Sequence, residues 1–396
     1  MKIHLIGIGG IGVSALAQYY LSKGHQVSGS DLIASEITDF LKEKGIRIMI
    51  GNFAKNIEKD FDLVVHSPAV KPDNPELSAA YKFQISNFKF QIKSYPEALG
   101  ELTKEYYTIA VAGSHGKSTT TAMIALILTL AGLDPTVIVG TKLKEFGGSN
   151  FRGGKSKLLV IEACEYDSSF LYYSPKIIVV TNVDKEHLDY FKTFANVKKA
   201  FKNFIKKLPS DGFLVQDLSD KQEDAAKLRK ILKVPGEHNV LNALAGLSVA
   251  RILAVPDSIT FKALSEFKGT WRRFEERQVQ ILNFKFQIIS DYAHHPVFQP
   301  HQHQRTYYLF NDFVKTFKNA DIDNIVITDI YDVAGRETKK INSEVSSKKL
   351  VEKINKKNVL YLPVNKLEDF AKENIGSGDV LIIMGAGDIY KLVDKF

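Results

Sequence analysis

The chain has 396 residues, which is enough for two or three domains that each bury a core of their own. Its 53 basic and 45 acidic residues leave a net charge of +8, but the lysines are scattered instead of clustered with aromatic residues. This pattern favours anionic small ligands over nucleic acid as partners. A single cysteine, Cys164, excludes an internal disulfide and is typical of the reducing cytoplasm; we expect it to be a small buried residue.

The N-terminal residues run directly into a predicted strand and glycine loop, without an apolar segment followed by a cleavage site. We therefore expect no signal peptide. The apolar run at residues 123–128 is far shorter than the roughly 20 residues of a membrane span. These features predict a cytoplasmic protein that does not insert into membranes.

The first glycine loop follows the apolar stretch IHLI. Gly7, Gly9 and Gly12 have the G-x-G-x-x-G spacing, and a helix is predicted directly after them. Asp31 stands where an acidic residue meets a ribose in dinucleotide-binding folds. A glycine loop at a helix N-terminus binds any diphosphate, so NAD, FAD and a UDP-sugar all remain open as ligands.

The next predicted strand, residues 63–66, leads to Ser67 in a Ser-Pro-Ala turn. This turn is expected at the carboxyl end of the sheet, where open α/β folds hold ligands. The tetrapeptide KFQI also occurs in this region, and its alternating polar and apolar residues predict an edge strand in each copy. The three copies begin at Lys82, Lys89 and Lys285.

A second glycine loop lies in the stretch YTIAVAGSHGKSTTTAMIALILTLA, which predicts a strand, a phosphate-binding loop and a buried helix. Gly113 and Gly116 would turn backbone N–H groups toward phosphate, Lys117 would supply a positive charge, and Ser118 or Thr119 would hold Mg²⁺. The general P-loop pattern has a further glycine five residues before Gly116, and a valine stands there instead. The match to that pattern is therefore incomplete.

Two nearly continuously apolar runs predict buried parallel strands, and each ends in an acid-rich turn. One turn begins with Glu162, and the other contains Asp184, His187 and Asp189. The carboxyl ends of parallel strands meet at one edge of a sheet, so these side chains can ligate Mg²⁺ on a nucleotide at the P-loop. Alternatively the acids cap the following helices, to which Asp184 and Asp189 are well suited.

Farther along the chain, His238 and Asn239 precede a predicted helix that carries Asn242 on its first turn. The three side chains can face one ligand, or His238 and Asn239 serve only as N-cap residues. Arg273 lies in a predicted linker, from which it could reach a phosphate. Four histidines fall between residues 294 and 303, but no cysteine or acid completes a usual zinc spacing, so we do not expect zinc.

Eight motifs together resemble the Mur ligase family, in the family's order and over nearly the whole chain. They are HLIGIGGIGVSALA, AGSHGKSTTT, EACEYDSSFL, TNVDKEHLDYF, GEHNVLNALA, TWRRFE, DYAHHP and FQPHQHQRT. The resemblance implies an α/β fold with three domains. A Rossmann-like UDP-sugar-binding domain would span residues 1–103, a P-loop-type ATP-binding domain residues 104–269, and a Rossmann-like amino-acid-binding domain residues 270–396.

The resemblance also implies an activity in peptidoglycan precursor synthesis. ATP would phosphorylate the lactyl carboxylate of UDP-N-acetylmuramate, and the amine of L-alanine would attack the acyl phosphate. The cofactors would be ATP and Mg²⁺, the partners the two substrates, and the protein a monomer or weak homodimer. Serine or glycine in place of alanine stays open, as does a sister enzyme that adds a preformed peptide.

Site residues follow from the resemblance position by position. The implied catalytic residues are Lys117, Glu162, His187, Arg273, His294 and Arg305. The implied ATP-binding residues are Gly113, Ser114, His115, Gly116, Lys117, Ser118, Thr119, His238, Asn239, Asn242 and Asp291. The implied substrate-binding residues are Gly9, Gly10, Ile11, Gly12, Asp31, Ser67, Tyr292, His301 and Arg305. The implied metal ligands are Ser118, Glu162 and His187.

One departure from the family lies between Pro296 and Phe298, where a helix and the start of a strand are missing. Consecutive parallel strands need a crossover of about a dozen residues or more. The C-terminal domain is therefore either truncated or lacks a segment in this numbering, and we favour the missing segment. Two rival functions stay open: an NAD-dependent oxidoreductase, based on the first glycine loop, and a non-catalytic nucleotide-binding derivative of a ligase.

Overall fold

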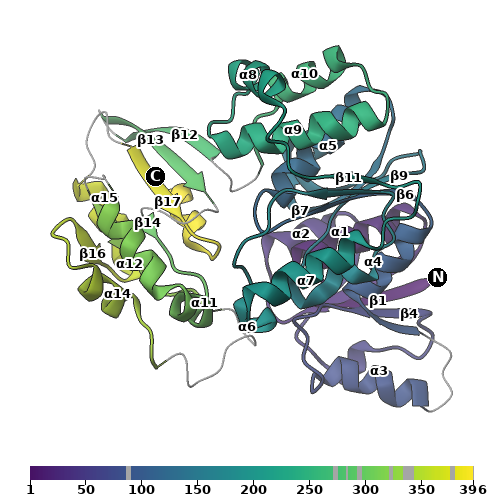
Figure 1. Ribbon diagram of the computed structural model, residues 1–396. Coiled ribbons are helices and arrows are strands. Elements are labelled where there is room, and N and C mark those ends of the chain that lie inside the picture. Colours follow the sequence, from purple (N-terminus) through teal and green to yellow (C-terminus); the bar gives the residue numbers. More distant parts are fainter. Residues whose placement is uncertain are drawn as a thin grey trace. The chain divides into compact units, whose positions relative to one another are not determined.

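The protein is described from a computed structural model that covers residues 1–85, 91–270, 275–281, 284–291, 297–320, 324–332, 343–374 and 380–395. Side chains are not described at residues 189, 275–281, 284–291 and 380. The chain divides into two compact units (Figure 1): Met1–Glu186 with Tyr190–Lys268, and His187–Asp189 with Gly269–Phe396. A search of the described helices finds none that is long and apolar enough to cross a membrane.

The first unit begins with a parallel five-stranded sheet of order β3-β2-β1-β4-β5. Its strands are β1 (Lys2–Ile6), β2 (Gln26–Asp31), β3 (Arg47–Ile50), β4 (Leu63–His66) and β5 (Gln91–Ser94). Its helices are α1 (Ile11–Ser22), α2 (Glu36–Glu43), α3 (Pro75–Ile85) and α4 (Tyr95–Lys104), with the short 3₁₀ helix η1 (Ala54–Asn56). The chain reverses its direction of progress between β1 and β4, which places the first glycine loop at a topological switch point.

A buried polar network joins the elements beneath this loop. The Glu76 carboxylate accepts hydrogen bonds from Ser30 Oγ at 2.5 Å, Asn56 Nδ2 at 2.6 Å and Phe53 N at 3.2 Å, and it contacts His4 Nε2 at 3.2 Å. Glu76 and His4 are fully buried. The Ser30 carbonyl in turn accepts the N–H groups of the first two loop residues, at 2.8 and 2.9 Å. The network therefore ties α3 and η1 to the strand that holds the loop.

The second sheet of the same unit has the order β11-β10-β6-β9-β7-β8 and is parallel except for β8. Its strands are β6 (Tyr107–Ala112), β7 (Thr136–Leu143), β8 (Ser149–Arg152), β9 (Leu158–Glu162), β10 (Ile177–Val180) and β11 (Phe213–Val215). The segments around it include α5 (Lys117–Leu130), η2 (Lys144–Phe146), η3 (Tyr166–Tyr172), α6 (Leu188–Phe191), α7 (Phe194–Ile205), α8 (Gln222–Ile231), α9 (Glu237–Ile252) and α10 (Asp257–Glu266). The predicted strand, loop and helix around Lys117 are confirmed.

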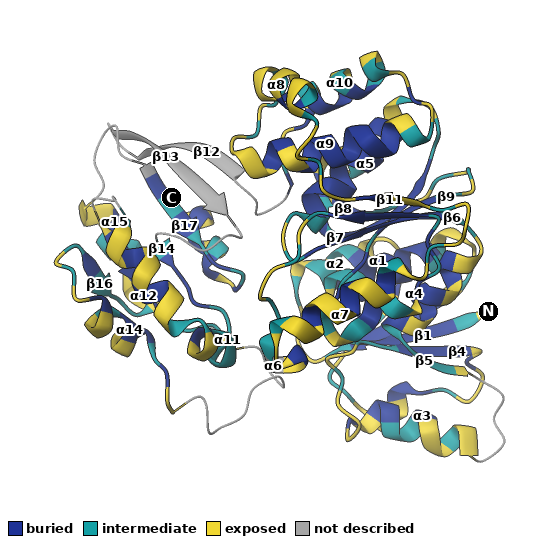
Figure 2. Cartoon of the chain, viewed as in Figure 1, coloured by how far each residue is buried: buried dark blue, intermediate teal, exposed yellow. Residues whose placement is uncertain are grey.

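Helix α5 is covered on nearly every side, which explains why its apolar residues have no single face. Its residues Met123, Ile124, Ile127 and Leu128 are almost fully buried. Helix α9 lies against it, with Gly246 next to Met123, Ile124 and Ile127, and strands β6, β7 and β9 also contact it. Figure 2 shows both helices largely in the buried colour, whereas α7 is exposed along one face. The phosphate-binding loop thus leads into the best-packed helix of the unit.

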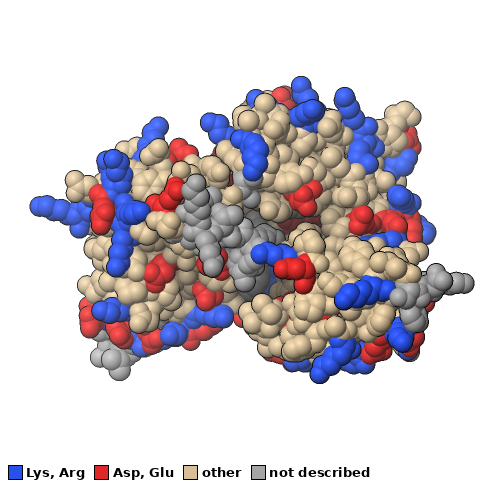
Figure 3. Space-filling view, turned by 90° about the horizontal axis from the view of Figure 1, so that it is seen from below, with Lys and Arg blue, Asp and Glu red and all other residues tan. Residues whose placement is uncertain are grey.

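The second unit contains a sheet of order β12-β13-β17-β14-β15-β16, parallel except for β12. Its strands are β12 (Glu275–Ile281), β13 (Phe284–Asp291), β14 (Val297–Phe298), β15 (Ile325–Ile327), β16 (Val359–Tyr361) and β17 (Val380–Met384). Its helical segments are α11 (His303–Tyr308), α12 (Phe310–Asn319), α14 (Ser347–Ile354), η4 (Val364–Lys366), α15 (Leu367–Asn374) and η5 (Ile389–Lys395). On the face drawn in Figure 3, basic and acidic side chains are interspersed, in keeping with the scattered lysines of the sequence.

Strands β13 and β14, between which the sequence predicts a crossover, both pair with β17. Asp291 at the end of β13 and Phe298 in β14 both pair with Met384, from opposite sides of β17. Strand β14 has only two residues, and both pair near the carboxyl end of β17. That a segment is missing between Pro296 and Phe298 stays a prediction.

We predict that Glu76→Ala destabilises the protein by about 3–5 kcal/mol, because it leaves several buried donors without their acceptor. The measurement is the free energy of unfolding in urea near neutral pH. Glu43→Ala, on the exposed face of α2, is the matched control and should change it by less than about 0.5 kcal/mol. A loss at Glu76 as small as that of the control would contradict the role assigned to the network.

The same network predicts a pH dependence. Burial pushes the pKa of Glu76 upward, but hydrogen bonds from His4, Ser30 and Asn56 outweigh it and hold that pKa below its usual value. The stability from this carboxylate is therefore present above the pKa of the unfolded chain and is lost as pH falls through the lower pKa of the folded state. As pH falls through that range, the free energy of unfolding should decrease less in Glu76→Ala than in the wild type; urea unfolding at several acid pH values measures it.

Candidate active site

The second glycine loop connects β6 to α5 and depends on two glycines with positive φ. Gly113 has φ of +144°, and a Cβ there would lie 1.9 Å from the Thr181 hydroxyl oxygen. Gly116 has φ of +80°, and a Cβ there would lie 2.4 Å from Asn242 Oδ1. Both positions therefore exclude any side chain, by backbone conformation and by lack of space.

The loop is attached to the turn that follows β10. Ser114 N donates to the Asn182 carbonyl at 3.1 Å, and the Ser114 hydroxyl accepts from Asp184 N at 2.8 Å. The His115 amide donates to Asn182 Oδ1 at 2.9 Å, while its side chain is more than half exposed and lies 3.9 Å from the carboxylates of Asp184 and Glu186. Asp184 holds this turn and does not cap a helix, since α6 begins only at Leu188 and the N-cap of α7 is Thr193.

Lys117 is buried against the loop. Its ammonium group donates to the Gly113 and Ser114 carbonyls at 2.5 and 3.2 Å and pairs with the Glu165 carboxylate at 3.0 Å. Burial alone would lower the pKa of Lys117, but the neighbouring Glu165 carboxylate raises it above its usual value. The lysine is therefore held as a cation at the phosphate-binding loop.

Glu162, the last residue of β9, receives two hydrogen bonds at one carboxylate oxygen. The Ser118 hydroxyl donates to Glu162 Oε2 at 2.6 Å, and the Gly140 amide donates to the same oxygen at 2.9 Å. A Cβ at residue 140 would lie 2.5 Å from that oxygen. The carboxylate therefore fits only because β7 carries a glycine there.

These residues fit a magnesium ion at the loop. Ser118 and Glu162 are hard oxygen donors, which Mg²⁺ prefers, and they already lie within hydrogen-bond distance of each other. Thr119 is buried in the first turn of α5. His187, the third predicted ligand, has φ of +54° and groups with the second unit, so its ligand role stays a prediction. Among the described residues no cluster of three His, Cys, Asp or Glu side chains forms a ready-made metal site.

The start of α9 reaches the loop through Asn242. Its Oδ1 accepts from the Thr120 hydroxyl at 3.1 Å, and its Nδ2 donates to Asn239 Oδ1 at 3.3 Å. Asn239 Nδ2 donates to the Pro235 carbonyl at 2.7 Å, and His238 is exposed. Helix α9 begins after Gly236, so the alternative of His238 and Asn239 as N-cap residues was wrong.

The first glycine loop is held from both sides. Gly9 N donates to Asp31 Oδ2 at 2.8 Å, so this carboxylate fixes the loop, and its predicted ribose contact stays a prediction. Gly12 has no room for a Cβ, which would lie 2.8 Å from the Tyr95 ring. Ser67 packs on Gly7 and its hydroxyl accepts from the Ala69 amide at 3.2 Å. Gly10 is the N-cap of α1 and Ile11 its first residue.

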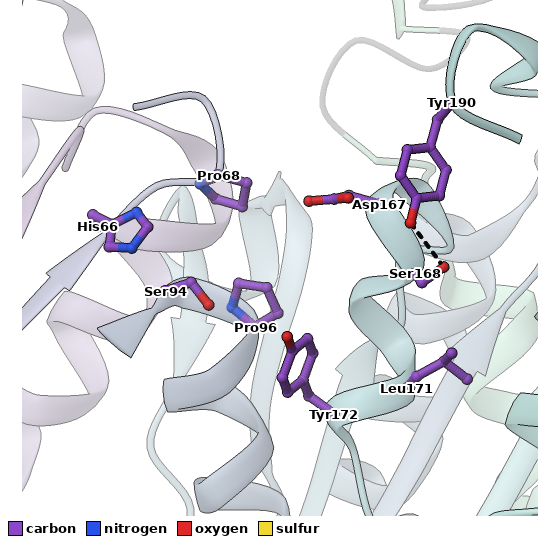
Figure 4. Close-up of a pocket in the computed structure, with 9 residues that line it drawn as sticks. All are labelled: His66, Pro68, Ser94, Pro96, Asp167, Ser168, Leu171, Tyr172 and Tyr190. Carbon is purple, nitrogen blue, oxygen red and sulfur yellow. Dashed lines mark hydrogen bonds between the residues drawn. The ribbon is translucent and has the colours of Figure 1, made fainter. Parts of the chain in front are cut away.

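A cavity of about 560 Å³ opens in the first unit, between the ends of β4 and β5 and the segment η3. Figure 4 shows His66, Pro68, Ser94 and Pro96 on one side, facing Asp167, Ser168 and Tyr190 on the other, with the Tyr172 ring next to Pro96. Asp167 and Ser168 have φ of +53° and +55°, a conformation that costs energy for residues other than glycine. The complete lining is His66, Pro68, Ser94, Pro96, Asp167, Ser168, Leu171, Tyr172 and Tyr190.

In the second unit, the ends of β14, β15 and β17 converge at one sheet edge. The His301 ring stacks on the Tyr331 ring with centroids 5.7 Å apart, and Arg305 lies in α11, which begins two residues later at His303. Gln302, between them, has φ of +69°. The predicted residues Arg273, Tyr292 and His294 lie outside the described residues, and only the backbone of Asp291 is described.

Sequence reasoning did not assign two residues of this site. Glu165 pairs with Lys117, and Gly140 donates to Glu162. A glycine within the β-branched run TVIVGTKL is a signal for a bulge or a close backbone approach, so Gly140 could have been found. Cys164, expected to be buried, is only partly buried, and desolvation raises the pKa of its thiol to about 11.

Comparisons with known proteins extend over the whole chain. The model of the Mur ligase catalytic domain matches residues 2–107, and the model of the Mur ligase middle domain matches residues 111–233. The UDP-N-acetylmuramate--L-alanine ligase of Acetivibrio thermocellus is 38% identical over 459 alignment positions, covering 100% of this chain and 95% of that protein. The corresponding ligase of Clostridium tetani is also 38% identical, over 460 positions, covering 100% and 97%.

The solved structures agree with the sequence relatives. The UDP-N-acetylmuramate-alanine ligase of Thermotoga maritima superposes with a TM-score of 0.79 at 27% identity, covering 100% of this chain and 98% of that one. The alignment to the Acetivibrio protein is 459 positions long against 396 residues here, so at least 63 positions face gaps in this chain (459 − 396). The motif spacing predicts that part of this shortfall falls between Pro296 and Phe298. On these matches, the chain belongs to the Mur ligase family.

Proposed function

We propose that the protein joins L-alanine to UDP-N-acetylmuramate with the use of ATP. The observation that supports this most directly is the cluster of Lys117, Ser118, Glu162 and Gly140 at a phosphate-binding loop, in the same unit as a second glycine loop. The named function of the relatives at 38% identity supports the choice of substrates. An NAD-dependent oxidoreductase would not explain the Ser118–Glu162 pair at the second glycine loop.

In the proposed reaction, ATP binds at the loop after β6 with Lys117 at its outer phosphates. The lactyl carboxylate attacks the γ-phosphorus, the bond to ADP breaks, and an acyl phosphate forms. The amine of alanine then attacks the acyl carbon, loses a proton, and phosphate leaves. A Mg²⁺ ion held by Ser118 and Glu162 would neutralise charge on the phosphates.

Each substrate has a candidate site in the chain. We infer that the diphosphate of the sugar nucleotide binds at the N-terminus of α1, where loop amides and the helix dipole favour an anion. The cavity lined by His66 and Asp167 has the size of a small-molecule site and is placed to take the sugar portion. Arg305, with His301 and Tyr331, is our candidate for the carboxylate of alanine, since a guanidinium binds carboxylate in two-point geometry.

Phosphate release tests the function as a whole. With UDP-N-acetylmuramate, ATP, Mg²⁺ and L-alanine we expect phosphate and a ligated product, and less of both with L-serine or glycine. Release no higher than in the reaction without alanine would refute the ligase and leave the non-catalytic derivative. A change in NADH absorbance with the sugar nucleotide would instead support the oxidoreductase.

Lys117→Ala should lower turnover at least about 10³-fold, because the outer phosphates lose a buried positive charge. Binding of UDP-N-acetylmuramate, measured by calorimetry, should stay within about threefold of the wild type, since Lys117 belongs to the other loop. The control is Lys199→Ala on the exposed side of α7, which should keep full activity. Turnover that survives in Lys117→Ala would disprove the assignment.

Glu162→Gln should raise the Mg²⁺ concentration for half-maximal rate by about 10-fold or more, because an amide oxygen is a weaker ligand than a carboxylate. The measurement is the rate as a function of Mg²⁺ at saturating substrates. Glu145→Gln, in the exposed η2 turn between β7 and β8, removes a carboxylate from the same hairpin as a control. Equal magnesium curves for Glu162→Gln and the wild type would count against the metal site.

A further inference from the structure

The hairpin of β7 and β8 is irregular at the point where it faces both glycine-loop regions. Ile138 pairs with Phe151 and Leu143 pairs with Ser149, so β7 advances five residues while β8 advances two. The three extra residues of β7 form a bulge that includes Gly140. Bulges of this kind redirect backbone groups and side chains, and they occur often beside active sites.

On one side, the bulge meets the candidate magnesium site. The Gly140 amide turns out of the strand ladder and donates to Glu162 Oε2 at 2.9 Å. The same oxygen accepts from the Ser118 hydroxyl. The position of the Glu162 carboxylate therefore depends on the path of β7.

On the other side, the strand opposite the bulge meets the first glycine loop. The Asn150 amide group donates to the Ile11 carbonyl, in the first turn of α1, and to Ser14 Oγ at 2.9 Å. Its Oδ1 accepts from Gln18 Nε2 at 2.8 Å, and Gln18 Oε1 accepts from the Ser149 hydroxyl at 2.8 Å. Each polar group of Asn150 thus has a partner on α1.

This contact is unusual as a way to dock a helix, since all four polar side chains are buried. Ser14 is fully buried, and Gln18, Ser149 and Asn150 are exposed by 7%, 6% and 4%. Apolar side chains of the same size would stabilise such a contact about as well. A fully satisfied polar cluster adds direction: it specifies one register between α1 and β8.

We propose that Asn150 is a positioning residue that sets the distance between the sugar-nucleotide loop and Glu162. The proposal rests on the function proposed above, in which a carboxylate held by the first loop must meet a phosphoryl group held by the second. The path from Ile11 to Asn150 is a hydrogen bond, and both neighbours of Asn150 pair with β7, one on each side of the bulge. From the bulge, the Gly140 amide donates to Glu162 in the same unit. A misplacement of about 1 Å between reacting groups lowers a rate by about 100-fold.

The test uses Asn150→Ala and the isosteric Asn150→Asp in the full-length protein. The carboxylate of the second variant keeps the acceptor for Gln18 but can donate neither to the Ile11 carbonyl nor to Ser14 Oγ, so it separates the directional bonds from the loss of volume. We expect kcat to fall about 10- to 100-fold in both variants. The Kd of ATP and that of UDP-N-acetylmuramate, each measured alone by calorimetry, should stay within about threefold, because neither loop is altered itself.

Arg152→Gln is the matched control on the same strand. It breaks the pair with Asp134 and the bond to the Pro135 carbonyl without touching α1, so it weakens the hairpin alone. Its kcat should equal that of the wild type. Gly140→Ala should in contrast shift the Mg²⁺ dependence, which both Asn150 variants should leave unchanged.

Three results would overturn the proposal: an unchanged kcat in both Asn150 variants, an equal fall of kcat in Arg152→Gln, or a loss confined to the Kd of one substrate. Ligation of alanine by the wild type, measured in parallel, distinguishes failure of the positioning role from failure of the proposed function. If the wild type ligates alanine and the Asn150 variants behave as the wild type, the positioning role fails and the ligase stands. If the wild type forms no product, the proposed function fails first.

Discussion

The hydrogen bonds at Glu162 Oε2 are the interaction on which the rest of the first unit depends. One comes from Ser118 on α5 and the other from Gly140 on β7, so a single oxygen fixes the phosphate-binding loop, the end of β9 and the bulged hairpin relative to one another. The glycine at position 140 is the condition for this arrangement, since any side chain would occupy the place of the carboxylate.

A second buried carboxylate has the corresponding place in the first sheet. Glu76 is satisfied by donors from β2, η1 and the segment before η1, and it contacts His4 on β1. Through the carbonyl of Ser30 it supports the first glycine loop from below. Both glycine loops of the unit are thus backed by an acid that is itself held in place by its donors.

Much of the fold was predictable because periodicity and turn chemistry agree along most of the chain. The strand, loop and helix around Lys117 and the two strands before the acid-rich turns are where the apolar runs predict them, and β9 and β10 do flank β6. The tetrapeptide KFQI shows the limit. The copy at Lys82 lies in helix α3 and the copy at Lys285 in the interior strand β13, so the edge-strand prediction was wrong for both. The strand propensity of four residues is too weak to decide their secondary structure, which depends on the tertiary contacts around them.

The site residues, too, were predictable only where a local motif defines them. Backbone-defined features such as Gly113, Gly116 and Lys117 follow from a local motif, whereas the partners Glu165, Gly140 and Asn150 come from distant strands and need the three-dimensional fold. Asn242 was predicted to contact the nucleotide, and the structure shows it packed on the loop glycine and bonded to Thr120. From the sequence motif alone, a residue that supports a binding loop cannot be distinguished from one that contacts the ligand.

The position of β17 has a consequence for the order in which the protein forms. This strand, Val380–Met384, follows β12 to β16 in the sequence, yet it lies in the interior of their sheet, between β13 and β14. All residues of the first unit come from the first 268, so this unit can close while synthesis continues. The second sheet must wait, with β13 and β14 unjoined, until β17 leaves the ribosome. During that interval its exposed strand edges depend on chaperones or on speed to avoid pairing with other chains.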